Sequence, residues 1–402
     1  MKWEKKKLCE CTEYITDGDH QPAPKADKGV HFIKIKDIVN NQVSFDAQVY
    51  VPQEYYDNLP MERKPQKEDV LYTVVGSFGI PSYVQTDELF CFERNIALLH
   101  PNKDIEPRFL YYSLKNPAFY KGIEIVANGS AQKLIPLSKL KDLKISVPDK
   151  EAQRHIADIL SAYDDLIENN QRQIKLLEEA AQRLYKEWFV DLRFPGHENT
   201  KIVDGVPEGW RVASIADICD TVGGGTPSTK IQSYYEKGDI LWVTPTDITR
   251  NFSLALLDTE KKITPEGLKN SSAKMLPAET ILMTSRASVG FFGMCKYEVC
   301  TNQGFISCIP KRENLQMYLL FNLKSRVEEI RQKAGGSTYL EISKTVFREL
   351  KIILPKDEVL AEYQKNVHDI FDEIYCRTEM IKSLVDMRNR LLPKLMSGEV
   401  EV

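Results

Sequence analysis

Residues Leu140–Pro148 read LKDLKISVP, and residues Phe347–Pro355, 207 positions further along the 402-residue chain, read FRELKIILP. The same offset relates Trp3 to Trp210. A nine-residue match that shares its offset with a distant tryptophan indicates a tandem repeat of one structural unit. The chain is long enough for two such copies, each with a core of its own.

Between these matching ends the two copies diverge. Pro101 corresponds to Pro310 and Asp37 to Asp247, so the offset drifts from 207 to 209 and 210. Similar ends around a divergent middle predict two units that share one fold and perform different versions of one task.

Short apolar runs predict strands in the middle of each copy. Val70–Val75 and Thr280–Thr284 read as buried strands, and His31–Lys36 alternates like a half-buried strand with Ile240–Thr244 as its counterpart. Polar, glycine-containing loops separate these runs, and such loops often carry binding residues. The predicted fold class is therefore α+β, with mixed strands and helices in each copy.

Each copy ends in a long predicted helix with a heptad stripe. The stripe in the first copy consists of Tyr163, Ile167, Asn170, Ile174, Leu177, Ala181, Leu184 and Trp188. The stripe in the second copy consists of Ile370, Ile374, Arg377, Ile381, Leu384, Arg388, Leu391 and Leu395. Two matched stripes predict that the helices pair antiparallel in a coiled coil, related by a pseudo-two-fold axis. Each helix could instead pack on its own domain.

The apolar members of the stripes are the predicted packing residues of this spacer: Ile167, Ile174, Leu177, Leu184, Trp188, Ile374, Ile381, Leu384, Leu391 and Leu395. Asn170, Arg377 and Arg388 are polar members that would fix the register of the pair. The predicted boundaries are a first domain at 1–150, a first helix at 151–195, a linker and second domain at 196–350, and a second helix at 351–402.

The charge of the chain is distributed unevenly. Its hydrophobic fraction of 42% and charged fraction of 28% are typical of a globular protein, and its net charge is −4. Residues 151–200 hold 10 acidic and 6 basic residues, and residues 351–402 hold 10 and 8, so both predicted helices are acidic. A protein that bound DNA alone, through phosphates, would be more basic. DNA binding would therefore require base contacts and partners that supply positive charge.

The sequence predicts no membrane span and no secretory signal, and its eight cysteines suit free thiols in a reducing cytoplasm. Catalytic motifs are scarce. The chain has no Walker phosphate loop and no CxxC pair, and we expect no metal site. Asn116-Pro117-Ala118-Phe119 resembles the adenine-binding loop of amino-methyltransferases but lacks its second proline, so a helix stop explains it better. Asp142-x-Lys144 and Glu349-x-Lys351 match a short nuclease pattern that is common by chance.

A set of short motifs gives the chain a recognisable pattern. Glu151-x-Gln153 opens the first helix, and Glu187-Trp188-Phe189-Val190-Asp191 closes it. Gly205–Trp210 opens the second copy, and Leu391–Glu399 ends the second helix. With the repeated Gly-Ser pairs at Gly129-Ser130 and Gly336-Ser337, this combination resembles the specificity subunit of type I restriction-modification systems over nearly the whole chain. The second helix departs from the pattern, because Glu358-Val359-Leu360 stands where Glu-x-Gln is expected.

The resemblance implies two target-recognition domains separated by conserved spacer helices. The chain would be a non-catalytic subunit in the cytoplasm that binds a bipartite, asymmetric double-stranded DNA target. It would hold methyltransferase subunits, two of them, and endonuclease-translocase subunits on that target. S-adenosylmethionine, ATP and Mg²⁺ would belong to those adenine-N6 methyltransferase and ATP-dependent endonuclease partners, with no cofactor in this chain. We also expect the methyltransferase to dock on the spacer helices, where we take Glu178, Glu179, Asp372 and Glu373 to be exposed.

Loop residues that could bind DNA were selected by side-chain chemistry: Arg and Lys suit guanine, Asn and Gln suit adenine, and Ser and Thr suit either base or phosphate. The candidates in the first domain are Thr16, Gly18, His20, Lys25, Lys28, Lys34, Ser77, Ser130, Gln132 and Lys133. The candidates in the second domain are Gly225, Thr226, Ser228, Lys230, Tyr234, Tyr235, Thr244, Arg286, Ser288, Gln303, Ser337 and Thr338. The alternative is a two-headed coiled-coil adaptor that binds no DNA.

Overall fold

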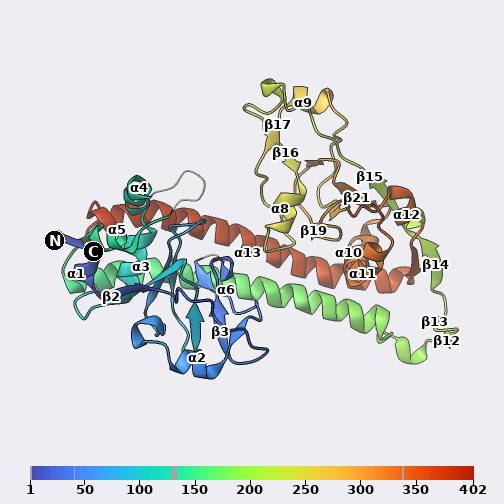
Figure 1. Cartoon of the computed structure of the whole chain (residues 1–402). Helices are drawn as coiled ribbons and strands as arrows, with labels where there is room; N and C mark the ends of the chain where they lie inside the picture. Colours follow the sequence, from blue (N-terminus) through green and yellow to red (C-terminus); the bar gives the residue numbers. More distant parts are fainter. Residues whose placement is uncertain (1, 40, 128–133, 337–338) are drawn as a thin grey trace. The chain divides into compact units, whose positions relative to one another are not determined.

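The computed structural model describes residues 2–39, 41–127, 134–336 and 339–402 (Figure 1). The chain divides into two compact units. Unit 1 is Met1–Leu166 with Leu384–Val402, and unit 2 is Ile167–Ser383. Each unit contains one mixed α/β head, which precedes a long helix in the sequence, and segments of both long helices.

The head of unit 1 is built on a four-stranded antiparallel sheet in the order β2-β10-β7-β8. Its strands are β2 (Thr12–Asp17), β10 (Ile96–Pro101), β7 (Val70–Thr73) and β8 (Pro81–Tyr83). Successive side chains of a strand point to opposite faces, and both faces of this sheet are covered. Tyr72 and Leu99 belong to the main core, whereas Leu71 and Leu98 belong to a second cluster with Phe90.

A smaller sheet and several helices cover the four-stranded sheet of unit 1. The smaller sheet has the order β6-β3-β9, with β3 parallel to β9. Its strands are β6 (Tyr50–Val51), β3 (Val30–Ile33) and β9 (Phe90–Phe92). The helices that share the main core with the four-stranded sheet are α1 (Leu8–Cys11), α3 (Pro107–Lys115), α4 (Pro117–Val126) and α5 (Leu137–Asp142), whereas α2 (Gln53–Asp57) packs on the smaller sheet. A short hairpin joins β4 (Ile38–Val39) to β5 (Gln42–Val43).

Unit 2 repeats this topology. Its four-stranded sheet has the order β15-β21-β18-β19, and its three-stranded sheet has the order β17-β16-β20, with β16 parallel to β20. The strands are β15 (Cys219–Val222), β16 (Ile240–Val243), β17 (Lys262–Ile263), β18 (Ile281–Thr284), β19 (Phe292–Gly293), β20 (Cys300–Thr301) and β21 (Phe305–Pro310). The helices are α7 (Ile215–Ile218), α8 (Pro245–Thr249), α9 (Pro265–Lys269), α10 (Gln316–Ser325), α11 (Val327–Gln332) and α12 (Lys344–Arg348), and β12 (Ile202–Val203) pairs with β13 (Val206–Pro207). The tandem repeat and the α+β class are confirmed.

Each head is closed at its base by two paired strands. In unit 1, β1 (Glu4–Lys7) pairs antiparallel with β11 (Lys144–Val147). In unit 2, β14 (Arg211–Ser214) pairs in the same way with β22 (Lys351–Leu354). The repeated nine-residue segment contributes β11 and β22, so the most similar parts of the two copies bring the start and the end of each head together. We call each strand pair a clamp.

The long helices are α6 (Lys150–Tyr185), followed by a π turn at Lys186–Val190, and α13 (Asp357–Ser397). In unit 1, Arg388 of α13 forms an ion pair with Asp164 of α6. In unit 2, Arg377 Nη1 lies 3.1 Å from Asn170 Oδ1. Also in unit 2, Tyr363 Oη donates to the Ala181 carbonyl at 3.4 Å. Position 170 of α6 therefore meets position 377 of α13 while position 181 meets position 363, so the two helices run antiparallel in this unit. No helix in the described ranges is long and apolar enough to cross a bilayer.

The stripe residues lie on the covered faces of both helices. In unit 2, the buried members are Ile167, Ile174, Trp188, Ile374 and Ile381, and the half-buried members are Leu177 and Leu184. In unit 1, Leu395 is buried, and Leu384 and Leu391 are half-buried. All three polar members make contacts between the helices: Arg377 binds Asn170, and Arg388 pairs with Asp164.

Two strand predictions were too long. The run predicted at His31–Lys36 ends as a strand at Ile33, because Lys34 caps a 3-10 turn at Ile35–Asp37 and its backbone N–H donates to the Asp37 carboxylate. The run predicted at Val70–Val75 ends at Thr73. Asn116, by contrast, ends α3 and caps α4 by accepting from the Ala118 N–H, which accounts for the Asn-Pro-Ala-Phe segment structurally.

Candidate nucleic-acid interface

One end of each four-stranded sheet gathers most of the candidate loops. In unit 1, β2 and β7 end where β10 and β8 begin, since Asp17 pairs with Ala97, and Ile96 pairs with Thr73. The loops that leave or approach these strands therefore meet at a single edge. The equivalent edge of unit 2 lies where Val222 pairs with Ser307. We call this edge the loop edge of each head.

Equivalent backbone contacts fix the loops of both heads. In unit 1, the Val74 N–H donates to the Asn95 carbonyl at 2.9 Å, and the Ile135 N–H donates to the Val74 carbonyl at 2.9 Å. In unit 2, the Ser285 N–H donates to the Gly304 carbonyl at 2.8 Å, and the Ile342 N–H donates to the Ser285 carbonyl at 3.0 Å. Three loops thus share one bonded framework, although their side chains differ between the heads.

A buried threonine holds the hairpin loop of each head. Thr73 Oγ1 donates to the Ser77 carbonyl at 2.7 Å and accepts from the Ile80 N–H at 3.0 Å. Thr284 Oγ1 binds the Ser288 carbonyl in the same way and accepts from the Phe291 N–H at 2.9 Å. The candidates Ser77 and Ser288 therefore occupy equivalent places on the loop edge.

The structure brings five candidates of the first head to its loop edge: Thr16, Gly18, His20, Lys34 and Ser77. A Cβ at Gly18 would lie 2.2 Å from the Phe92 carbonyl oxygen, so close backbone approach requires glycine there. Lys25 and Lys28 are exposed but precede the opposite end of β3. Ser130, Gln132 and Lys133 lie outside the described residues, in a segment that is followed by Leu134, which bridges to Val75.

Acidic residues at the end of β2 and just after it already have partners within the head. Asp19 accepts from Tyr55 Oη at 3.1 Å and lies 3.3 Å from Arg63 Nη1, and His20 Nε2 lies 3.1 Å from Asp17. Burial opposes the charged form of Asp19, but hydrogen bonds from Gln21 and Tyr55 and the charge of Arg63 lower its pKa overall. This part of the loop edge is therefore less repulsive to phosphates than its sequence suggests.

Six candidates of the second head meet at its loop edge: Gly225, Thr226, Thr244, Arg286, Ser288 and Gln303. Thr226 Oγ1 donates to Gln303 Oε1 at 2.5 Å. Arg286 is exposed, and its Nε lies 3.6 Å from Glu341 Oε2. Thr244 caps α8, because its Oγ1 donates to the Asp247 carboxylate at 2.6 Å, so its role is structural.

Four other second-head candidates, Ser228, Lys230, Tyr234 and Tyr235, follow Gly225 and Thr226 in the loop between β15 and β16. Trp242 Nε1 donates to the Gly225 carbonyl at 3.0 Å, and Tyr235 packs edge-on against Trp242 while its hydroxyl donates to the Pro227 carbonyl at 2.6 Å. Lys230 is exposed beside Tyr235. The remaining candidates are Ser228, which is exposed, Tyr234, which is half-buried, and Ser337 and Thr338, which lie outside the described residues.

Sequence reasoning missed one basic residue at the loop edge. Arg94 is exposed in the turn between β9 and β10, and Gln303 occupies the corresponding turn between β20 and β21. The signal was present, because the offset of 209 that relates Pro101 to Pro310 also relates Arg94 to Gln303.

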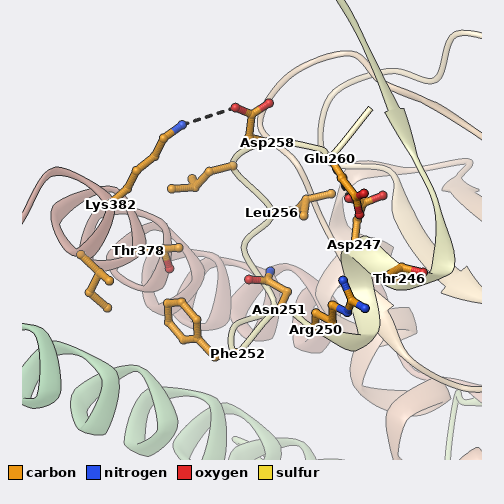
Figure 2. A pocket seen from close by; sticks show the side chains of 12 residues that line it. Thr246, Asp247, Arg250, Asn251, Phe252, Leu256, Asp258, Glu260, Thr378 and Lys382 are labelled. Carbon is orange, nitrogen blue, oxygen red and sulfur yellow. Dashed lines mark hydrogen bonds and ion pairs between the residues drawn. The ribbon is translucent and has the colours of Figure 1, made fainter. Parts of the chain in front are cut away.

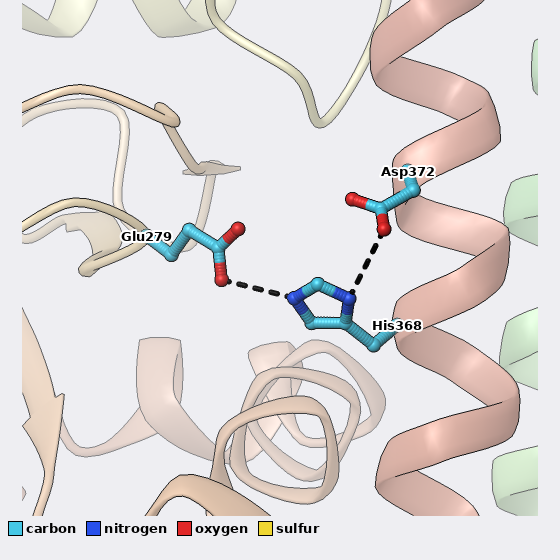
Figure 3. Close-up of side chains that lie close together, drawn as sticks. All are labelled: Glu279, His368 and Asp372. Atoms are coloured by element: carbon cyan, nitrogen blue, oxygen red, sulfur yellow. Dashed lines mark hydrogen bonds and ion pairs between the residues drawn. The ribbon is translucent and has the colours of Figure 1, made fainter.

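The opposite end of the sheet in unit 2 faces α13. His368 of α13 lies between two carboxylates, with Nε2 3.0 Å from Glu279 and Nδ1 3.4 Å from Asp372 (Figure 3). Lys296 Nζ lies 2.6 Å from the other oxygen of Asp372. These groups lie close enough to hold a metal ion, but both imidazole nitrogens and one carboxylate already have partners. The cluster joins the head to the helix.

A second attachment of this head to α13 surrounds a pocket of about 350 Å³ (Figure 2). The pocket is lined by α8, by the segment that follows it, and by Thr378, Ile381 and Lys382 of α13. Lys382 Nζ lies 3.6 Å from Asp258 at its rim. The loop edge is therefore distinct from the helix-facing parts of the head.

The expectation that Glu178, Glu179, Asp372 and Glu373 are exposed was wrong for Glu178, whose side chain is only 22% exposed. Glu178 accepts from the Leu254 N–H at 2.7 Å, because a loop distant in the sequence covers it. Asp372 pairs with Lys296 of the head. Among the described residues, Glu179 and Glu373 are accessible and pair with arginines one turn away on their own helices.

Comparisons with known proteins agree with this arrangement. A family model described as the type I restriction modification DNA specificity domain matches twice, at residues 1–179 and 207–385. The chain is 26% identical to the type I restriction enzyme HindI specificity subunit of Haemophilus influenzae, over 92% of this chain and 94% of that protein. It is 38% identical to the MjaIX specificity subunit of Methanocaldococcus jannaschii, over 42% of this chain and 39% of that protein.

The fold is similar to that of a solved structure. The type I restriction-modification system S subunit from M. genitalium matches with a TM-score of 0.61 and 18% sequence identity, over 98% of this chain and 96% of that one.

Proposed function

Since this chain belongs to the family of type I restriction-modification DNA specificity subunits, we propose that its two loop edges read the two halves of a bipartite DNA target. The observation that supports this most is the equivalence of the edges. The same backbone framework presents different side chains, with Arg94 in one head where Gln303 stands in the other. A shared scaffold with unlike side chains suits a target with two unlike halves.

The chain would act together with enzymatic partners in the cytoplasm. Two methyltransferase subunits would carry S-adenosylmethionine, and endonuclease-translocase subunits would carry ATP and Mg²⁺. The net charge of −4 supports this division. Tight binding to DNA depends strongly on contacts between basic residues and phosphates, so the partners would supply the basic surfaces that this chain lacks.

The direct test is to express the full chain with its methyltransferase and to sequence methylated adenines across the host genome. We expect one motif, made of two unlike specific halves separated by a fixed number of unread bases. A continuous motif, or methylation that does not depend on this chain, would contradict the proposal and would favour the adaptor alternative.

The purified chain alone should transfer no methyl group and cut no DNA. Neither its sequence motifs nor the described residues of the loop edges supply a nucleotide-binding or nucleophilic site. Incubation with labelled S-adenosylmethionine, and separately with ATP and Mg²⁺, should leave target DNA unlabelled and intact. Addition of the methyltransferase partner is the positive control, and labelling by the verified-pure chain would overturn the assignment of chemistry to the partners.

The methyltransferase should dock on the accessible face of the spacer helices. On α6, Leu176 is 57% exposed, and Glu179 lies three residues further on the same face. The variant Leu176→Lys/Glu179→Lys should weaken co-purification of the methyltransferase at least about tenfold, because lost apolar burial and reversed charge both act at one surface.

The matched control for this docking variant is Glu266→Lys, an exposed change on α9 of the head. Both variants should keep the melting temperature of the parent chain, since none of the three side chains is buried in a core. If the α6 variant co-purifies with the methyltransferase as well as the control does, this face of α6 is not the docking site.

A further inference from the structure

We propose that Arg94 and Gln303 are the equivalent base-reading residues of the two heads, with Arg94 selecting a guanine and Gln303 selecting an adenine. This inference rests on the proposed function of the loop edges. It goes further by assigning one base to one side chain in each head.

The two turns are held in the same frame. The Glu93 N–H donates to the Ile33 carbonyl at 3.0 Å, as the Asn302 N–H donates to the Val243 carbonyl at 3.0 Å. On its other side each turn accepts from the hairpin loop of its own head, at Asn95 and at Gly304. The backbone beneath Arg94 and Gln303 is therefore fixed in both heads, and a fixed backbone lets one side chain define one base position.

The carboxylates near Arg94 are bound to other groups, so its guanidinium is available to a ligand. The neighbouring carboxylates have other partners: Glu93 Oε1 accepts from the Ile35 N–H at 2.7 Å, and Asp19 binds Tyr55 and Arg63. Within the described ranges Arg94 itself makes no side-chain hydrogen bond or ion pair. An exposed arginine beside satisfied carboxylates retains its five donors, and its fork matches O6 and N7 of guanine.

Gln303 is oriented rather than free. Its Oε1 accepts from Thr226 Oγ1 at 2.5 Å, which fixes the amide plane and leaves the NH₂ group and a second lone pair of Oε1 for a ligand. One donor and one acceptor in a plane match N7 and the N6 amino group of adenine. The Thr226 contact thus prepares Gln303 for an adenine, and no arginine-type fork is present at this position.

The test uses the full chain co-expressed with its methyltransferase, and measures methylation at every single-base variant of the parent motif. Arg94→Gln should reduce the preference for guanine at one position of one half-site at least about tenfold and leave the other half unchanged. Gln303→Arg should reduce the preference for adenine at one position of the other half. Lys67→Gln, an equal charge change at the opposite end of the first sheet, is the control and should alter neither half.

The outcomes separate this inference from the proposed function. A parent chain that directs no bipartite methylation contradicts the proposed function itself. If the parent motif is bipartite, equal weakening at all sequences by Arg94→Gln assigns Arg94 to a phosphate and overturns the inference, as does an unchanged preference. A Thr226→Val variant should relax the same adenine position as Gln303→Ala, which a residue with a purely structural role would not do.

Discussion

Replacement of residues 215–350 by the corresponding head of another family member should change one half of the DNA target completely and leave the other half unchanged. These residues lie between the strands of one clamp, and they include every described part of the second loop edge. A mismatched base pair costs about 1 to 3 kcal/mol, so several new contacts in one half are enough to redirect methylation entirely. Sequencing of methylated adenines measures the result.

The transplanted head must keep its attachments to the helices of unit 2. Glu279 binds His368, the Leu254 N–H binds Glu178, and Asn322 binds Tyr185. A donor with the same three contacts should therefore be chosen. The reciprocal exchange of residues 8–143 is the matched control and should change only the other half. A swap that altered both halves together would refute the independence of the heads.

Loss of the Asp164 carboxylate should destabilise unit 1 by about 3 kcal/mol, which corresponds to roughly 6 to 12 °C in melting temperature. Asp164 accepts from Tyr112 Oη at 2.7 Å, pairs with Arg388, and lies 3.6 Å from Lys115 Nζ. It thereby ties α3 of the head to both long helices. Asp164→Asn leaves two largely buried cations without a counter-charge, and thermal or denaturant unfolding measures the loss.

Two controls show whether charge is the cause. Asp165→Asn removes the neighbouring, exposed carboxylate, which lies 3.9 Å from Arg108, and should change stability by less than about 0.5 kcal/mol. The double variant Asp164→Asn/Arg388→Met should recover part of the loss, because it removes one of the stranded charges. If the double variant is less stable than the single one, the pair does not act through its charge.

The loss caused by Asp164→Asn should also depend on pH. Burial lowers the pKa of Lys115 to about 8, and the charge of Asp164 opposes this. Without Asp164 that pKa falls further, while the unfolded value stays near 10.5, so the unfolded chain binds more protons than the folded one across this range. The stability of both chains rises with pH, but below about pH 8 the stability of the variant rises more steeply, because its folded form binds fewer protons at Lys115. The variant should therefore lie closer to the parent chain at pH 9 than at pH 7.

The repeat, the fold class and the long helices could be predicted from the sequence because they depend on periodic signals. A nine-residue match, a shared tryptophan offset and heptad spacing can all be read from the order of residues, without knowledge of which side chains touch. The loop edge could be predicted only in part. Ser77 and Ser288 were chosen for their chemistry, and the structure places them at equivalent positions.

The misses arose from contacts between distant parts of the chain. Glu178 reads as an exposed helix residue, but the Leu254 N–H, 76 residues away, binds its carboxylate. Lys34 reads as part of a strand, but Asp37 and Glu93 bind the backbone N–H groups that begin a 3-10 turn there. Arg94 was missed because its counterpart lies at an offset of 209, and the offset of 207 fits only the ends of the copies.

The clamps have a consequence for how such a protein changes over generations. In each copy, β1 with β11, or β14 with β22, forms a short antiparallel pair where the chain enters and leaves the head. A genetic exchange with crossover points in these two strands would pass on an intact head and an intact pair of helices, whatever lies between. A new DNA preference can therefore be inherited together with a whole head. The clamp strands, which lie away from the loop edges, would then set how readily a lineage acquires such a head.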